Sequence, residues 1–167
     1  MTPTRGPAER RGLVVGFGNV LRTDDGVGFV VVERLEADPR VVNGLRGGWL
    51  RVFWSQQLLP ELAVDFAAAD VVVLVDANAE LAPGEIRVDA VEAAAAGAAS
   101  GPGMTHHVDA GSLAAMARDL YGGSPVVRVV GVGPESMDVG EKLTATVEAA
   151  VPEIIETVVG LLGDIAR

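Results

Sequence analysis

Hydrophobic positions along the chain alternate between short continuous runs and longer segments with helical spacing. Such runs, interrupted only by Arg51 and Arg128, predict strands at residues 12–16, 49–54, 71–75 and 126–131. An alternating segment, Glu85–Val88, predicts an antiparallel edge strand. Helical spacing predicts helices over residues 24–35, 57–68, 109–120 and 144–165, the last of them kinked or split by Pro152. This order of elements predicts an α/β fold, namely a three-layer α/β/α sandwich with a mostly parallel mixed sheet of about five strands.

Composition and charge narrow the class of protein. Residues 1–10 are expected to form a disordered tail before a single domain over residues 11–167. No apolar run approaches the ~20 residues of a membrane span, and no secretory signal begins the chain, so a cytoplasmic protein is expected. The net charge of −10 disfavours nucleic acid or an anionic membrane as a partner. The absence of cysteine excludes disulfides, thiolate metal ligands and cysteine nucleophiles.

The first predicted strand ends in a glycine turn that leads to two adjacent acids. Gly16 and Gly18 follow the outline of a dinucleotide-binding loop, but Leu21 stands where that loop has its third glycine. Asp24 and Asp25 occupy the start of the next helix, where a pyrophosphate would need free N–H groups and no negative charge. The loop therefore favours a cation over a phosphate. The alternative is that both acids, or Thr23, only cap the helix.

A second acid and a histidine are expected at the same edge of the sheet. Asp76 ends the third predicted strand, and parallel α/β sheets bind ligands beyond the carboxyl ends of their strands. The two histidines of the chain, His106 and His107, precede the helix that begins at residue 109. Two carboxylates and one imidazole suit a divalent metal such as zinc or nickel, with a coordination position open for water or substrate. The alternatives are that Asp76 begins a turn and that the histidines are exposed bystanders.

Taken together, several segments resemble the maturation endopeptidases of nickel–iron hydrogenases. The similar segments are Gly16–Asn19 with Asp24–Gly28, Val75–Ala77, Thr105–His107, Val130–Ser136 and Leu143–Val147. The resemblance covers roughly residues 12–162 in order, and the tract Gln56–Ala63 is similar to the branch that serves soluble hydrogenases. Members of this family cut a short C-terminal extension from the hydrogenase large-subunit precursor after nickel has been inserted.

The resemblance implies a site and a partner. Asp25, Asp76 and His107 match the metal-contacting acid, aspartate and histidine of the family, which makes them the expected catalytic and metal-contacting residues. Nickel is then carried by the precursor, and zinc or another divalent metal is a candidate ligand of the isolated protein. The expected enzyme is a nickel-recognising endopeptidase, monomeric when free, and Asp24 is a candidate general base. The alternative function is a non-catalytic metal- or nucleotide-binding module on the same fold.

Overall fold

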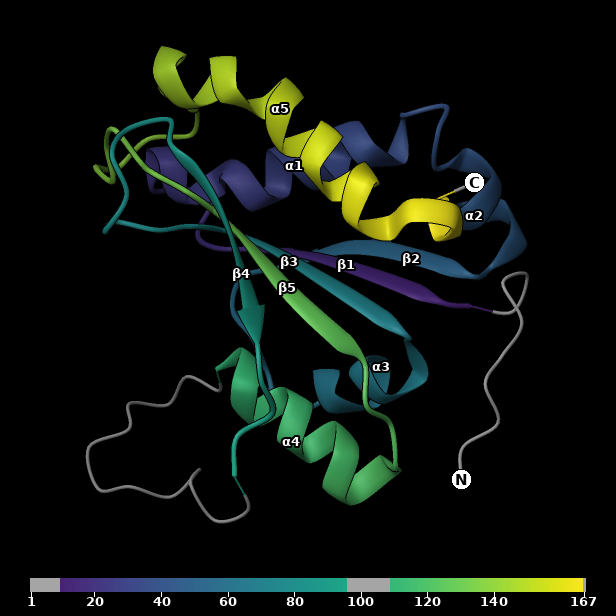
Figure 1. Ribbon diagram of the computed structural model, residues 1–167. Helices are drawn as coiled ribbons and strands as arrows, with labels where there is room; N and C mark the ends of the chain where they lie inside the picture. The colour runs from purple at the N-terminus through teal and green to yellow at the C-terminus, as the bar shows by residue number, and fades with distance from the viewer. Residues whose placement is uncertain (1–9, 96–108, 167) are drawn as a thin grey trace.

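The computed structural model describes residues 10–95 and 109–166 and shows one five-stranded sheet with helices on both faces (Figure 1). The expected tail therefore lies, apart from Arg10, outside the described residues. The strands are β1 (Gly12–Phe17), β2 (Leu50–Ser55), β3 (Val71–Ala77), β4 (Ile86–Val91) and β5 (Val126–Val132). The α-helices are α1 (Val27–Glu36), α2 (Val42–Gly47), α3 (Leu62–Ala68), α4 (Ala110–Tyr121) and α5 (Ala145–Leu162). Short 3-10 helices lie at Thr23–Gly26 and Gly163–Ala166. None of the described helices is both long and apolar enough for a membrane span.

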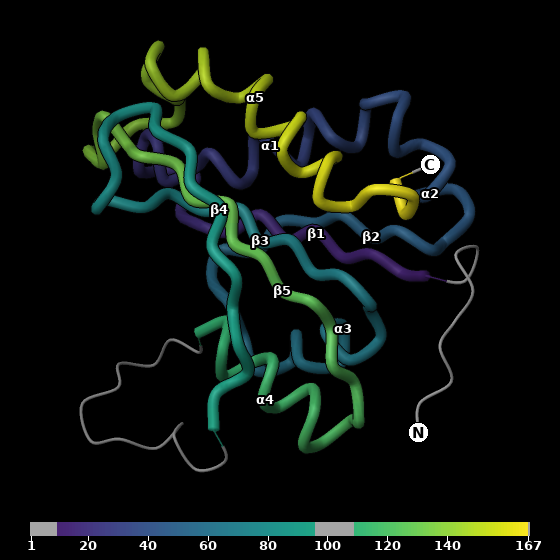
Figure 2. The backbone as a smooth tube through the Cα atoms, in the orientation of Figure 1, coloured from purple at the N-terminus to yellow at the C-terminus, as the bar shows by residue number. Residues whose placement is uncertain are grey.

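The sheet has the strand order β2-β1-β3-β5-β4 and is parallel except for β4, which pairs antiparallel with β5. This arrangement confirms the predicted sandwich and its antiparallel edge. Figure 2 shows β1 and β3 side by side in the middle of the sheet. After β1 the chain passes to β2, on one side of β1, and then crosses to β3, on the other side of β1. The strand order therefore changes direction between β1 and β3. Such a switch point opens a crevice at the carboxyl ends of the two strands.

Both faces of the sheet are buried, which explains why the central strands read as continuous apolar runs. One face carries Val14 and Val73 and packs against α1 and α5. The opposite face carries Leu13 and Val72 and packs against α3 and α4, with Phe66 of α3 fully buried in this core. Figure 1 shows these helices as separate layers above and below the sheet, with α2 in the same layer as α1 and α5. Side chains that alternate along each strand therefore build two hydrophobic cores.

Three helices differ from the expectation. The helix predicted from residue 57 begins only at Leu62, because residues 56–61 form turns around Pro60. Helix α2 was not predicted, since its six residues include two glycines and carry no apolar period. Helix α5 runs through Pro152 without a break, so the predicted split is wrong. Pro152 has no N–H group, so the carbonyl of Glu148, four residues earlier, lacks its helical hydrogen bond. Both residues are exposed, and water can donate to this carbonyl instead.

Candidate functional site

A cleft of about 350 Å³ lies at the carboxyl ends of the parallel strands, at the switch point between β1 and β3. Its wall is mainly apolar, with a small number of acidic and amide side chains. The lining residues are Phe17, Gly18, Asp25, Gln56, Gln57, Leu58, Leu74, Asp76, Asp109, Ala110 and Val129. The structure thus brings two of the predicted site residues, Asp25 and Asp76, into one cavity. An apolar cleft with few convergent polar groups is typical of a binding or active site.

Asp25 is held in place by the glycine turn that precedes it. Its Oδ2 accepts a hydrogen bond of 2.7 Å from the backbone N–H of Asn19. Gly18 has a φ of 135°, and a Cβ atom at this position would lie 2.1 Å from the carbonyl oxygen of Asp25. Only glycine combines this backbone conformation with so close an approach. Gly18 is therefore required for the turn that brings the Asp25 carboxylate to the cleft.

The helix-capping interpretation of the acids is wrong. The residues Thr23–Gly26 form a 3-10 helix, and α1 begins after it with Gly26 as N-cap and no side-chain cap. The hydroxyl of Thr23 instead donates to the carbonyl oxygen of Asp138 at 2.6 Å. Asp24 and Asp25 therefore lie ahead of the regular helix, where their carboxylates make other contacts.

Asp76 lies near the end of β3, opposite Gly131 of β5. The strand continues to Ala77, and the side chain of Asn78 rather than that of Asp76 begins the following turn by accepting from the N–H of Glu80. The turn interpretation of Asp76 is therefore wrong. The pKa of Asp76 is raised from 3.8 to about 7, chiefly by burial and secondly by the charge of Asp25, while a hydrogen bond with the Ala77 backbone opposes the shift.

The two acids of the loop have different surroundings. Asp24 is fully buried and does not line the cleft. Its oxygens accept hydrogen bonds from the backbone N–H groups of Glu135, Ser136 and Thr144 and from the Thr144 hydroxyl, at 2.8 to 3.0 Å. A general base must reach a proton of the reacting groups. Asp24 is away from the cleft and occupied by these donors, which argues against the predicted role as general base.

The histidines lie outside the described residues, so the structure does not place His106 or His107. Asp109, two residues after His107, lines the cleft and caps α4 by accepting from the N–H of Ser112 at 2.7 Å. Within residues 10–95 and 109–166, no group of three His, Cys, Asp or Glu residues is arranged to hold a metal ion. Of the three predicted site residues, the described part of the chain therefore places two in the cleft, the acid pair Asp25 and Asp76.

Several lining residues were not predicted as part of the site. Gln56, Gln57 and Leu58 follow β2, and the rule that placed Asp76 at the carboxyl edge of the sheet applies equally to this segment. Phe17 and Val129 belong to strands and carry no sequence signal that separates them from the core. The position of Gln56 and Gln57 directly after a predicted strand could therefore have identified them as lining residues of the cleft.

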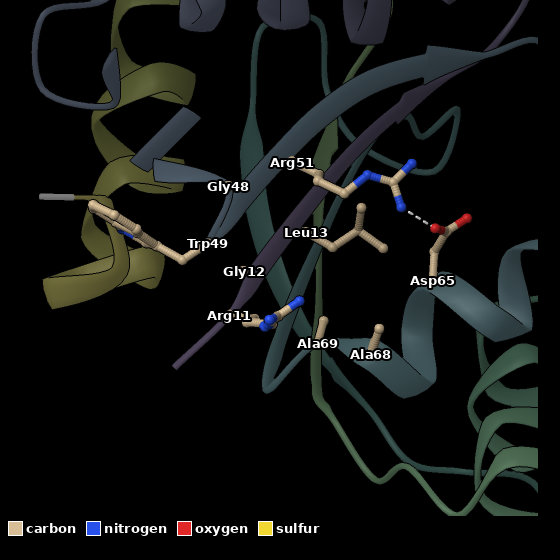
Figure 3. A pocket seen from close by; sticks show the side chains of 9 residues that line it. All are labelled: Arg11, Gly12, Leu13, Gly48, Trp49, Arg51, Asp65, Ala68 and Ala69. Carbon is tan, nitrogen blue, oxygen red and sulfur yellow. Dashed lines mark hydrogen bonds and ion pairs between the residues drawn. The ribbon is translucent and has the colours of Figure 1, made fainter. Parts of the chain in front are cut away.

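A second, smaller hollow lies at the opposite edge of the sheet, near the amino ends of β1 and β2 (Figure 3). Its volume is about 40 Å³, and it is lined by Arg11, Gly12, Leu13, Gly48, Trp49, Arg51, Asp65, Ala68 and Ala69. Figure 3 shows the guanidinium of Arg51 turned towards Asp65, with which it forms an ion pair. The single acid of this hollow is thus paired with a cation. Asp25 and Asp76 lie together only in the cleft at the carboxyl ends of the strands, so that cleft is the candidate site.

Comparisons with known proteins identify the family and the fold. Residues 55–161 match the model of a protein family, the hydrogenase maturation proteases (HycI). A search of curated proteins finds no significant match. The solved structure of the hydrogenase maturating endopeptidase HybD from Escherichia coli is similar, with a TM-score of 0.70, 27% identity and 91% of each chain covered.

Two archaeal structures share the fold at lower identity. The [NiFe] hydrogenase maturation protease HycI from Thermococcus kodakarensis has a TM-score of 0.67 and 22% identity, covering 91% of this chain and 92% of its own. The hydrogenase 2 maturation peptidase from a Thaumarchaeota archaeon has a TM-score of 0.63 and 24% identity, covering 92% of this chain and 99% of its own.

Proposed function

Because the chain belongs to the hydrogenase maturation protease family, we propose that it removes the C-terminal extension of a nickel-loaded hydrogenase large-subunit precursor. The observation that supports this proposal most is the meeting of Asp25 and Asp76 in one cleft at the switch point of the sheet. A precursor that brings its own metal needs a site with a few free carboxylates and room for a peptide. The cleft offers both.

The nickel ion of the precursor is the group that these carboxylates are proposed to contact, together with His107. A bound metal ion can polarise a carbonyl or activate a water molecule, and either effect would promote cleavage of the adjacent peptide bond. Asp25 contributes a carboxylate that is fixed by the Asn19 N–H. Asp76 must lose its proton to contact the metal, and in the metal-free protein its pKa is raised to about 7.

The remainder of the cleft suits an extended peptide tail. Phe17, Leu58 and Val129 offer apolar surface that excludes water from the tail. The amide side chains of Gln56 and Gln57 can donate to and accept from a peptide backbone. The substrate proposed for this cleft is therefore the C-terminal segment of the precursor, with the metal centre at the acid pair.

We further propose that the protein acts in the cytoplasm and that it is a monomer when it is not bound to the precursor. It needs no resident metal, since the substrate supplies nickel.

The alternative function is a non-catalytic metal- or nucleotide-binding module. The acid pair disfavours a nucleotide because carboxylates repel phosphate groups. Titration of the free protein with nickel, zinc and nucleotides tests this alternative, which predicts tight binding of one of them and no cleavage.

The site assignment is tested by a double variant, Asp76→Ala with His107→Ala, in an assay that follows cleavage of nickel-loaded precursor. Loss of two metal contacts should abolish the release of the C-terminal peptide. The matched control is Asp65→Ala, which removes a carboxylate at the opposite edge of the sheet. The control should cleave like the wild type, and full activity of the double variant would overturn the assignment.

A further inference from the structure

Asp24 is a buried carboxylate that the proposed reaction does not use. Among the described residues, Asp24 is the one charged residue that is fully buried, with an exposure of 0%. A carboxylate tolerates such burial only where protein donors replace its hydration. Three backbone N–H groups and one hydroxyl fill that role here, and they belong to Glu135, Ser136 and Thr144. Charge-assisted bonds of this kind are stronger than bonds between neutral groups.

These donors lie 111 to 120 residues away in the sequence. Glu135 and Ser136 follow β5, whereas Thr144 is the N-cap of α5. Backbone bonds reinforce the same junction, from Asp24 N–H to the Ser136 carbonyl at 3.1 Å and from Thr23 N–H to the Gly140 carbonyl at 2.9 Å. Asp24 therefore joins the loop after β1 to both ends of the loop between β5 and α5.

The junction lies directly beside the acid of the cleft. Asp25 is in the same 3-10 helix, which has no side-chain cap of its own. On one side, the helix contacts Gly18 and the N–H of Asn19. On the other side, it is held by the partners of Asp24. The position of the Asp25 carboxylate thus depends on both sets of contacts.

We propose that Asp24 is a positioning residue. By binding the loop formed by residues 135–144, it fixes the 3-10 helix that carries Asp25 and so holds the Asp25 carboxylate at the cleft. This inference rests on the proposed function, because the reaction gives the position of Asp25 its importance. Asp24 itself touches neither substrate nor metal. Its effect on the reaction passes entirely through Asp25.

The test compares Asp24→Asn with the wild type at a temperature at which circular dichroism shows both to be folded. Asparagine has the same shape, but its NH₂ group would face N–H donors and break at least one of the bonds. We expect kcat for precursor cleavage to fall by about tenfold or more, since small displacements of a reacting group cost such factors. KM should change much less. The amide proton of Asn19, whose acceptor is Asp25, should exchange with solvent deuterium at least about tenfold faster.

Two further sets of variants separate positioning from stability. Thr144→Val removes the hydroxyl donor and should reproduce part of both effects. Thr144→Ser keeps the hydroxyl and should have the wild-type kcat and Asn19 exchange rate. Val158→Ala removes core packing in α5 and should lower the melting temperature while leaving kcat and the Asn19 exchange rate unchanged.

The positioning role is overturned if Asp24→Asn melts at a lower temperature yet keeps the wild-type kcat and Asn19 exchange rate. If Asp24→Asn does not fold, Thr144→Val decides by the same two readouts. If the wild-type protein fails to cleave the precursor, the proposed function fails. The Asn19 exchange rate still tests whether Asp24 positions Asp25, because that measurement needs no substrate.

Discussion

The ionised form of Asp76 should destabilise the folded protein. Burial and the charge of Asp25 raise the pKa of Asp76 from 3.8 to about 7. The folded state therefore keeps a proton that the unfolded chain releases, and stability from this group is complete below about pH 4 and lost as the pH rises through 7. At about 1.4 kcal/mol for each pKa unit, burying the ionised carboxylate costs about 4 kcal/mol relative to the neutral acid.

Replacing Asp76 by asparagine removes this cost, because the amide has nearly the same shape and does not ionise. Asp76→Asn should be more stable than the wild type by about 4 kcal/mol at about pH 8.5 and by about half of that at about pH 5.5. Urea unfolding followed by the fluorescence of Trp49 and Trp54 gives the free energy of unfolding at each pH. Asp25→Asn should give a smaller gain, since repulsion from Asp25 is the lesser of the two causes.

The result that refutes this reasoning is a stability difference between Asp76→Asn and the wild type that stays constant from pH 5.5 to pH 8.5. A carboxyl with an ordinary pKa would give that result, because it would be ionised in both folded and unfolded states over the whole range. The third carboxylate of the cleft, Asp109, remains in all of these variants, so its contribution cancels in the comparison.

Three further substitutions test other parts of the account. Asp25→Asn should lower the cleavage rate by about 100-fold while the protein stays folded, and cleavage at the wild-type rate would remove Asp25 from the site. Gly18→Ala should cost about 1–3 kcal/mol in thermal unfolding, because alanine is strained at a φ of 135° and its Cβ would meet the Asp25 carbonyl; unchanged stability would contradict this. Asp109→Ala should cost about 1 kcal/mol in urea unfolding through loss of the α4 cap to Ser112, whereas Asp109→Asn should restore most of it.

The strands were predictable because the sheet gives them a strong pattern. Central strands buried on both faces are continuous apolar runs, and β4, at the edge, alternates. Helices α1, α4 and α5 were predictable because each has one apolar face. Helix α2 has only six residues and no such face, and the position of Pro152 within α5 does not reveal that its missing bond faces solvent.

The site was predictable in part. The rule for parallel sheets placed Asp25 and Asp76 at one edge, because it depends only on where strands end. The difference between Asp24 and Asp25 could not be deduced from local sequence, since the donors that bury Asp24 follow more than 100 residues later. The role of His107 stays a prediction. The raised pKa of Asp76 depends on burial and on Asp25, and both arise only when the chain is folded.

The measurement that tests the central claim most directly is mass spectrometry of a hydrogenase large-subunit precursor after incubation with the purified protein. The account predicts that the wild-type protein releases one C-terminal peptide from nickel-loaded precursor. It predicts no peptide from nickel-free precursor, and release about 100-fold more slowly by the Asp25→Asn variant. Absence of cleavage with nickel-loaded precursor, or equally fast cleavage without nickel, would contradict the claim that this cleft recognises the metal centre and cuts beside it.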